Sequence, residues 1–238
     1  MIGHPLRLFL VALLLAAAAL LPMRVLLAAA GPARLPFSAD AIDGPFWNAT
    51  ARNARWRELA LGDVDLTLRP LALFRGALGL RARSREIDLD IEFGHRAGLH
   101  RADGLLQLPP RAGLPLTAVL EAGALRAVFA DGRCVDAGGT LEALLTPVDA
   151  SAWAPVRLTA TPGCDGDAWV ARLTPPDGAA PAGPPVEARI EVRADGSFRT
   201  QATFASSDPA TRLALAARGF EAQDPARMVR SVSGRLFD

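Results

Sequence analysis

Few side chains in this sequence are of the types that carry out chemistry, and their spacing does not favour a reaction centre. Glu92, His95 and His100 lie close together and raise the question of a metal site. A zinc site on a helix needs two histidines three or four residues apart, whereas these two are five apart in a glycine-containing turn after a strand pattern. We therefore predict no metal site and no other cofactor.

The serines and carboxylates also give no indication of a reaction centre. Ser197, Ser206 and Ser207 have no histidine nearby in the sequence, and no Gly-x-Ser-x-Gly elbow is present. Carboxylates between Asp63 and Glu92 recur at alternate positions of strand patterns, which is typical of a solvated sheet face. The chain contains no Lys and no Tyr, so neither residue type can act in catalysis. The sequence therefore predicts that the protein is not an enzyme.

Length and charge limit the possible partners. The chain has 238 residues, enough for one large domain or two small ones. It carries 26 basic and 25 acidic residues, a net charge of +1. A nucleic-acid binder needs a surplus of cations to displace phosphate counterions, so we expect no nucleic-acid partner. Half of the residues are hydrophobic, which excludes disorder over the whole chain.

Residues 1–30 have the pattern of an export segment. Leu8 to Leu21 is a run of fourteen apolar residues without a charge, preceded by Arg7. We favour an uncleaved signal anchor, because the apolar stretch is long enough for a helix that crosses a bilayer. Ala28 to Ala30 also fit a cleavage site, so a removable signal peptide is the alternative. Arg7 favours a cytoplasmic amino terminus, with the rest of the chain on the other side of the membrane.

The two cysteines lie in the part expected outside the cytoplasm. An even number of cysteines in an oxidising compartment predicts one disulfide between Cys134 and Cys164, with two unpaired buried thiols as the alternative. Their spacing does not fit a thiol-disulfide exchange motif, which has two intervening residues. We therefore expect a structural disulfide.

Alternation of apolar and polar residues predicts β-strands over much of the remaining chain. Asp195-Gly196 stands between two alternating runs and predicts a hairpin with a type I′ turn. Asp103-Gly104 and Asp131-Gly132 are further predicted tight turns. The alternating runs are Val64–Leu68, Leu78–Ala82, Ile87–Phe93, Val186–Val192 and Phe198–Phe204.

Helix is predicted in only two places. Asp208-Pro209 provides an N-cap and a first-turn proline for a helix that continues to Arg218. Leu141–Leu145 is a second, short candidate, and Met228–Leu236 is a predicted closing strand. We therefore predict an all-β fold, a curved and largely antiparallel sheet with one or two short helices. This fold forms one domain over residues 31–238, behind a single N-terminal transmembrane helix.

A short stretch at the start of this domain resembles a known family. Ile42–Ala51 contains Gly44, Pro45, Trp47 and Asn48. It is similar to the signature that follows the anchor in type II secretion system protein N, the general secretion pathway protein N family. Further stretches that resemble the family, in the same order, are Arg69–Leu78, Gly139–Leu141, Trp169–Leu173, Leu213–Gly219 and Gly234–Leu236.

The resemblance implies a non-catalytic component of the type II secretion machinery, which exports folded periplasmic proteins across the outer membrane. It implies a single-pass protein of the bacterial inner membrane with a cytoplasmic amino terminus and the bulk of the chain in the periplasm. The implied partners are other secretion components, the secretin and the inner-membrane platform. We expect them to bind at an open sheet edge, where unpaired backbone groups can accept another strand.

The motif residues also have a structural explanation. Gly44 permits a tight bend, Pro45 fixes the entry to the next segment, and Trp47 offers a large apolar surface that fastens the first strand to the core. Direct contact of Trp47 with a partner is the alternative.

A second function remains open. Curved antiparallel sheets on inner-membrane anchors, as in the AsmA-like and lipopolysaccharide-export families, can hold acyl chains on their concave face. Strands that alternate Leu, Ile and Phe with carboxylates would suit such a trough. The alternative prediction is therefore a membrane-anchored periplasmic domain that binds or transfers lipid.

Overall fold

The computed structural model describes residues 37–45, 47–57, 59–69, 72, 76–108, 116–147, 154–176 and 185–236. The predicted anchor over residues 1–30 lies outside these ranges. Within them, no helix is long and apolar enough to cross a membrane. The described residues belong to two compact units, the first ending at Arg85 and the second spanning Glu86–Leu236. Both units lie within the predicted β-rich region 31–238.

The first unit is a small antiparallel sheet built around β3. One side of β3 pairs with β4 and the other with β1 and β2, and β4 pairs in turn with β5. Ala51 and Ala54 of β3 and Val64 of β4 form a buried core. Because two of these three side chains are alanines, the core of this unit is small. The strands are β1 (Phe37–Ser38), β2 (Ala41–Asp43), β3 (Asn48–Trp56), β4 (Leu59–Arg69) and β5 (Leu78–Arg83).

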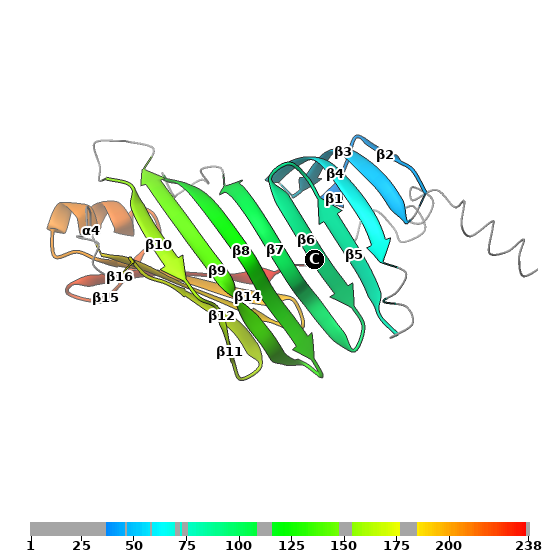
Figure 1. Cartoon of the computed structure of the whole chain (residues 1–238). Coiled ribbons are helices and arrows are strands. Elements are labelled where there is room, and N and C mark those ends of the chain that lie inside the picture. Colours follow the sequence, from blue (N-terminus) through cyan, green and yellow to red (C-terminus); the bar gives the residue numbers. More distant parts are fainter. Residues whose placement is uncertain are drawn as a thin grey trace, which may run out of the picture. The chain divides into compact units, whose positions relative to one another are not determined.

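The second unit contains two antiparallel sheets (Figure 1). In the first sheet, β6 to β10 lie side by side in sequence order; in the second sheet the order is β11-β12-β13-β14-β16-β15. The strands of the first sheet are β6 (Ile87–Phe93), β7 (Arg96–Leu108), β8 (Leu116–Ala130), β9 (Arg133–Pro147) and β10 (Val156–Ala160). The elements of the second sheet are β11 (Gly163–Asp165), β12 (Ala168–Leu173), β13 (Val186–Arg193), β14 (Ser197–Ala205), α4 (Pro209–Ala216), β15 (Glu221–Asp224) and β16 (Arg227–Arg235).

The two sheets of the second unit share one core, because each has an apolar face that must be covered. Leu141 of β9 and Leu158 of β10 point inward from the first sheet, and Leu158 is 1% exposed. Trp169 of β12, Val186 of β13 and Met228 of β16 meet them from the second sheet. The side chains at alternate positions therefore point outward to the surface.

Two specific bonds reinforce the packing of these sheets. The disulfide predicted from the sequence is present and joins Cys134 of β9 to Cys164 of β11, with their Cα atoms 5.5 Å apart. The buried indole N–H of Trp169 donates to the carbonyl of Arg126 on β8 at 2.8 Å. This second bond satisfies a polar group that would otherwise be buried without a partner.

The backbone also connects the two sheets at one corner. Thr159 of the edge strand β10 and Thr174, just after β12, exchange hydrogen bonds of 2.8 and 3.0 Å. Part of the outer edge of β10 is therefore paired rather than open.

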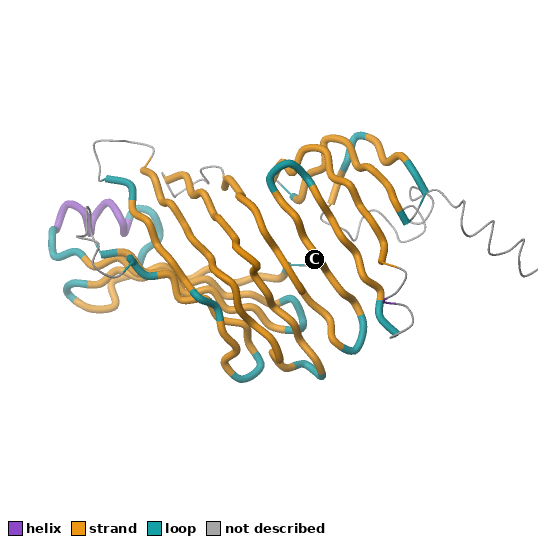
Figure 2. Tube along the Cα trace, viewed as in Figure 1, coloured by secondary structure: helices purple, strands orange, loops and turns teal. Residues whose placement is uncertain are grey.

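The predicted strands are confirmed. All five alternating runs lie in strands, namely β4, β5, β6, β13 and β14, and the predicted closing strand is β16. The helix after Asp208 is confirmed as α4, the purple element in Figure 2. Its Asp208 carboxylate accepts the N–H of Thr211 at 2.8 Å, as an N-cap does.

Two other predictions of local structure are wrong. Leu141–Leu145 is part of β9 rather than a helix, because burial of alternate side chains in the core outweighs the good helix propensity of this stretch. Asp103-Gly104 lies inside β7 rather than in a turn. A Cβ at Gly104 would lie 2.0 Å from the carbonyl oxygen of Glu86, so this glycine allows a close approach of two backbones.

The other two Asp-Gly pairs form turns of different geometry. Asp131 and Gly132 both have positive φ, +50° and +76°, as a type I′ turn requires. At the β13–β14 hairpin, Gly196 has φ +75° whereas Asp195 does not have a positive φ. The Gly196 N–H donates to the Arg193 carbonyl at 3.0 Å. The predicted hairpin is therefore confirmed, but its turn is type I followed by a glycine bulge rather than type I′.

Removal of the disulfide tests how strongly it stabilises the second unit. The double substitution Cys134→Ser and Cys164→Ser is expected to lower the free energy of unfolding by about 3 to 4 kcal/mol, because the bond constrains a long loop in the unfolded chain. Urea unfolding of the full-length protein in detergent measures this change. A reducing agent should destabilise the wild type and leave the double variant unaltered. Equal stability of the wild type and the double variant under oxidising conditions would contradict this account.

Candidate functional site

The motif that resembles the secretion family connects β2 to β3 in the first unit. Gly44 has φ +107°, and a Cβ there would lie 2.5 Å from the backbone oxygen of Asn48. The Asn48 N–H donates to the Pro45 carbonyl at 3.0 Å, which closes a turn. Only glycine fits this bend without a backbone shift, because both the positive φ and the close approach exclude a side chain.

The backbone of Trp47 is hydrogen-bonded to the neighbouring strand. Its carbonyl accepts the N–H of Leu68 at 2.9 Å, which ties the motif to β4. The Trp47 side chain is half-buried, and the next buried side chain is that of Ala49. The motif thus positions the start of β3.

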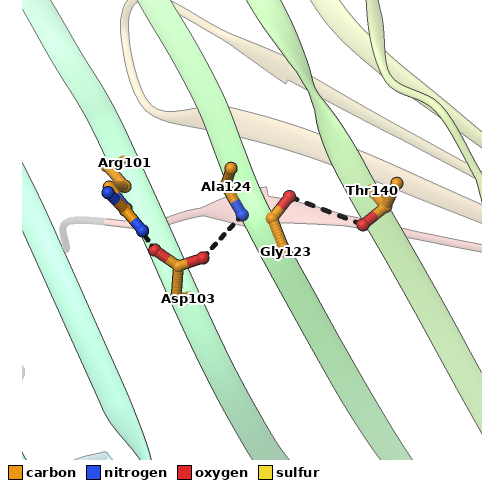
Figure 3. A network of polar contacts seen from close by, with 5 residues as sticks. All are labelled: Arg101, Asp103, Gly123, Ala124 and Thr140. Atoms are coloured by element: carbon orange, nitrogen blue, oxygen red, sulfur yellow. Dashed lines mark hydrogen bonds and ion pairs between the residues drawn. The ribbon is translucent and has the colours of Figure 1, made fainter.

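An irregular place in the first sheet of the second unit is held by side chains (Figure 3). The β7–β8 ladder shifts register near Ala124, whose φ is +48°. The Asp103 carboxylate accepts the Ala124 N–H at 2.8 Å and a second hydrogen bond from Arg101. On the next strand the Thr140 hydroxyl donates to the Gly123 carbonyl at 3.5 Å. These side chains replace ladder bonds that the irregularity removes.

The same contacts change the acidity of Asp103. The Arg101 side chain, and after it the backbone N–H of Ala124, hold the pKa of Asp103 below its ordinary value, because both donate to the ionised form. With both carboxylate oxygens engaged, the network is structural.

A polar hollow of about 520 Å³ lies on the outward face of the second sheet. It spans β13, β14 and β16 near the β13–β14 turn. Three guanidinium groups, three hydroxyl groups, one carboxylate and one aromatic ring line it, those of Arg193, Arg199, Arg235, Ser197, Ser231, Ser233, Glu191 and Phe198. Sequence reasoning did not find this site, because its residues come together only through the register of three strands.

The structure places the candidate residues His95, His100 and Ser206 in different surroundings. His95 is exposed, with its Nδ1 atom 3.7 Å from Asp131, and the Nε2 atom of His100 is buried without a hydrogen-bond partner. No three His, Cys, Asp or Glu residues are placed to hold a metal ion within the described ranges. Ser206 accepts the Asp208 N–H, next to α4.

These features define an all-β, disulfide-linked protein whose described surface offers strand edges and a polar hollow. Its sequence matches the family Type II secretion system (T2SS), protein N, over residues 37–230, and the chain belongs to this family. The resemblance based on the Gly44–Asn48 motif is therefore confirmed, and the protein is a component of type II secretion. No curated protein and no solved structure matches the chain.

Gly44→Ala tests the motif bend. We expect a loss of about 3 kcal/mol in the free energy of unfolding, since the new Cβ meets backbone atoms at a positive φ. The matched control is Gly62→Ala, where φ is +69° but nothing lies within 4 Å of the new Cβ. The control should cost about 1 kcal/mol. Urea unfolding followed by tryptophan fluorescence measures both, and equal losses would contradict the steric explanation.

Asp103→Asn tests the network in Figure 3 through pH. A carboxyl group whose pKa is lowered by folding stabilises the folded state above its unfolded pKa of about 3.9. That contribution is lost as the pH falls through the lowered folded-state value. The stability difference between wild type and Asp103→Asn should therefore be constant near neutral pH and shrink below about pH 4.

Arg101→Gln is the matched control for this measurement. It keeps the carboxylate and its bond to Ala124, so a smaller pH dependence of the same sign should remain. Thermal unfolding at several pH values measures both variants. A difference between wild type and Asp103→Asn that does not change with pH would show that the carboxylate is not preferentially ionised in the folded state.

Proposed function

We propose that this secretion component is a non-catalytic, single-pass protein of the inner membrane whose two β-rich units lie in the periplasm. The family match over residues 37–230 is the observation that carries the proposal. The apolar run in residues 1–30 supports the anchor, and Arg7 supports a cytoplasmic amino terminus. The Cys134–Cys164 disulfide supports an oxidising compartment for the second unit.

The proposed role is to hold other components of the machinery, among them the secretin and the inner-membrane platform. Open antiparallel sheets suit this role, because backbone groups at a strand edge can pair with another chain. The outward faces of the strands add charged and polar side chains that can select a partner.

One observation favours lipid binding as a second candidate. Ile87, Leu89 and Ile91 of β6 share a face with Leu99 and Ala102 of β7. The three isoleucine and leucine side chains of β6 are only half-buried and do not belong to the core between the sheets. This face provides apolar surface of the kind that acyl chains bind.

One experiment separates the two candidates. Tagged full-length protein is cross-linked in cells and purified from native membranes, and both proteins and lipids are identified. Recovery of the secretin or platform proteins is the expected result. Phospholipid or lipopolysaccharide recovered without secretion proteins would instead favour the lipid carrier.

Matched variants sharpen the interpretation of this experiment. Leu89→Glu places a charge on the apolar face of β6, whereas Asp88→Glu alters the opposite face of the same strand and keeps its charge. Secretion proteins should be recovered with both variants. Loss of bound lipid with Leu89→Glu alone would place the lipid on the β6 face.

A further inference from the structure

We propose that the open part of β16 and the adjacent polar hollow bind an extended acidic segment of another protein, which adds to the second sheet as a strand. This inference rests on the proposed function, in which the chain holds other components, and it names the site and the chemistry of the partner.

The backbone of β16 is covered on its outer side only near its start. The β15–β16 ladder ends at Val229, so β15 lies beside the end of β16 nearer to α4 (Figure 1). Ser231 and Ser233 follow, and both are exposed. The Leu236 N–H donates to the Gly196 carbonyl, on the side of the strand that faces β14. Successive residues of a strand direct their backbone N–H and C=O groups to opposite sides. Ser231 and Ser233 therefore direct their N–H and C=O groups away from β14, where no described residue pairs with them.

This part of the edge is regular and contains no proline. β16 pairs with β14 in an unbroken register from Arg227 to Arg235, without a bulge or a proline. The Phe198 ring lies against Gly234 on the inner face, where an added Cβ would be 3.0 Å from the ring. A regular edge with outward-facing backbone groups is a template for strand addition.

One cation beside the edge, Arg199, forms no ion pair within the described residues. Arg193 is paired with Asp167 at 3.2 Å. Glu191 lies directly opposite Arg199 on β13, but its carboxylate is paired with Arg189 at 2.7 Å. Arg199 is exposed and makes no ion pair or hydrogen bond with any described residue. A carboxylate of a partner would supply the ion pair that Arg199 lacks.

Register places Arg199 within reach of an added strand. Arg199 lies directly opposite Ser233, and this short side chain is the only one between Arg199 and the open edge at that level of the sheet. Neighbouring strands are about 5 Å apart, so an added strand would lie about 10 Å from β14. The long side chains of Arg and Glu can together span that distance. Acidic residues at alternate positions would therefore face the hollow.

The backbone edge favours a peptide over a lipid head group. A phosphate could pair with Arg199, but it offers no alternating donors and acceptors to the backbone of Ser231 and Ser233. An extended peptide satisfies both the edge and the charge.

The test uses full-length protein in detergent and a fluorescent peptide of alternating Glu and Val, with binding followed by fluorescence anisotropy. Ser233→Pro removes an outward N–H without removing a bond to β14, and it should weaken binding about fivefold. Arg199→Glu should weaken binding about tenfold and improve binding of the peptide in which Arg replaces each Glu.

Two matched variants control for indirect effects. Ser233→Ala keeps the backbone N–H and should bind the acidic peptide as the wild type does. Arg172→Glu makes the same charge change on β12, which β13 and β14 separate from the open edge, and it should also bind normally. Hydrogen exchange of the wild type should show protection of the Ser231 and Ser233 amides when the peptide is added.

Several results would overturn the inference. These are equal binding by wild type and Ser233→Pro, an equal loss with Arg172→Glu, or no added amide protection. Binding of phosphatidylglycerol vesicles that depends on Arg199 and is not displaced by the peptide would assign the hollow to lipid instead. If Ser233→Pro loses the peptide but still recovers the same secretion proteins from native membranes, those proteins do not bind at this edge, and the proposed function remains.

Discussion

Burial of two apolar sheet faces against each other is the constraint on which the second unit depends. Once Leu141 and Leu158 of one sheet pack against Trp169 and Val186 of the other, the two-residue period of each strand fixes every alternate side chain on the outside. The Cys134–Cys164 disulfide holds this arrangement at one point. The outward residues are then free to vary for binding, since the core does not need them.

Face-to-face packing covers the faces of the two sheets but does not pair the backbone groups at their edges. The two edges at β10 and β16 differ in how much of their backbone is paired within the fold. Thr159 of β10 pairs with Thr174, so this edge is partly used within the fold. In contrast, β15 covers β16 only as far as Val229. A protein that works by holding partners needs a rigid surface with unsatisfied groups, and a strand fixed on one side by β14 provides such groups in a defined geometry.

The sequence was sufficient to predict those elements whose local sequence pattern favours the same structure as burial in the core. Alternation found the strands, and Asp208-Pro209 found α4, because capping and alternation act over a few residues. Prediction from the sequence failed where contacts between residues distant in the sequence determine the local structure. Leu141–Leu145 forms a strand despite its helix propensity, because its alternate side chains are buried in the core. Gly104 lies within a strand, where it accommodates the backbone of Glu86. The polar hollow could not be predicted, because it requires the order β14-β16 across the intervening α4 and β15.

The charge pattern along the strands shows which described arginines have a partner for their charge. Residues two apart on a strand share a face, so Arg101 with Asp103 and Arg189 with Glu191 neutralise each other locally. Arg199 has the neutral residues Ser197 and Gln201 at these positions, and Glu191, directly opposite on β13, is paired with Arg189 instead. Arg172 also has neutral residues two positions away, Val170 and Thr174, but it lies on β12, away from the open edge. An unbalanced arginine therefore becomes a specific binding group only where the sheet also leaves a strand edge unpaired.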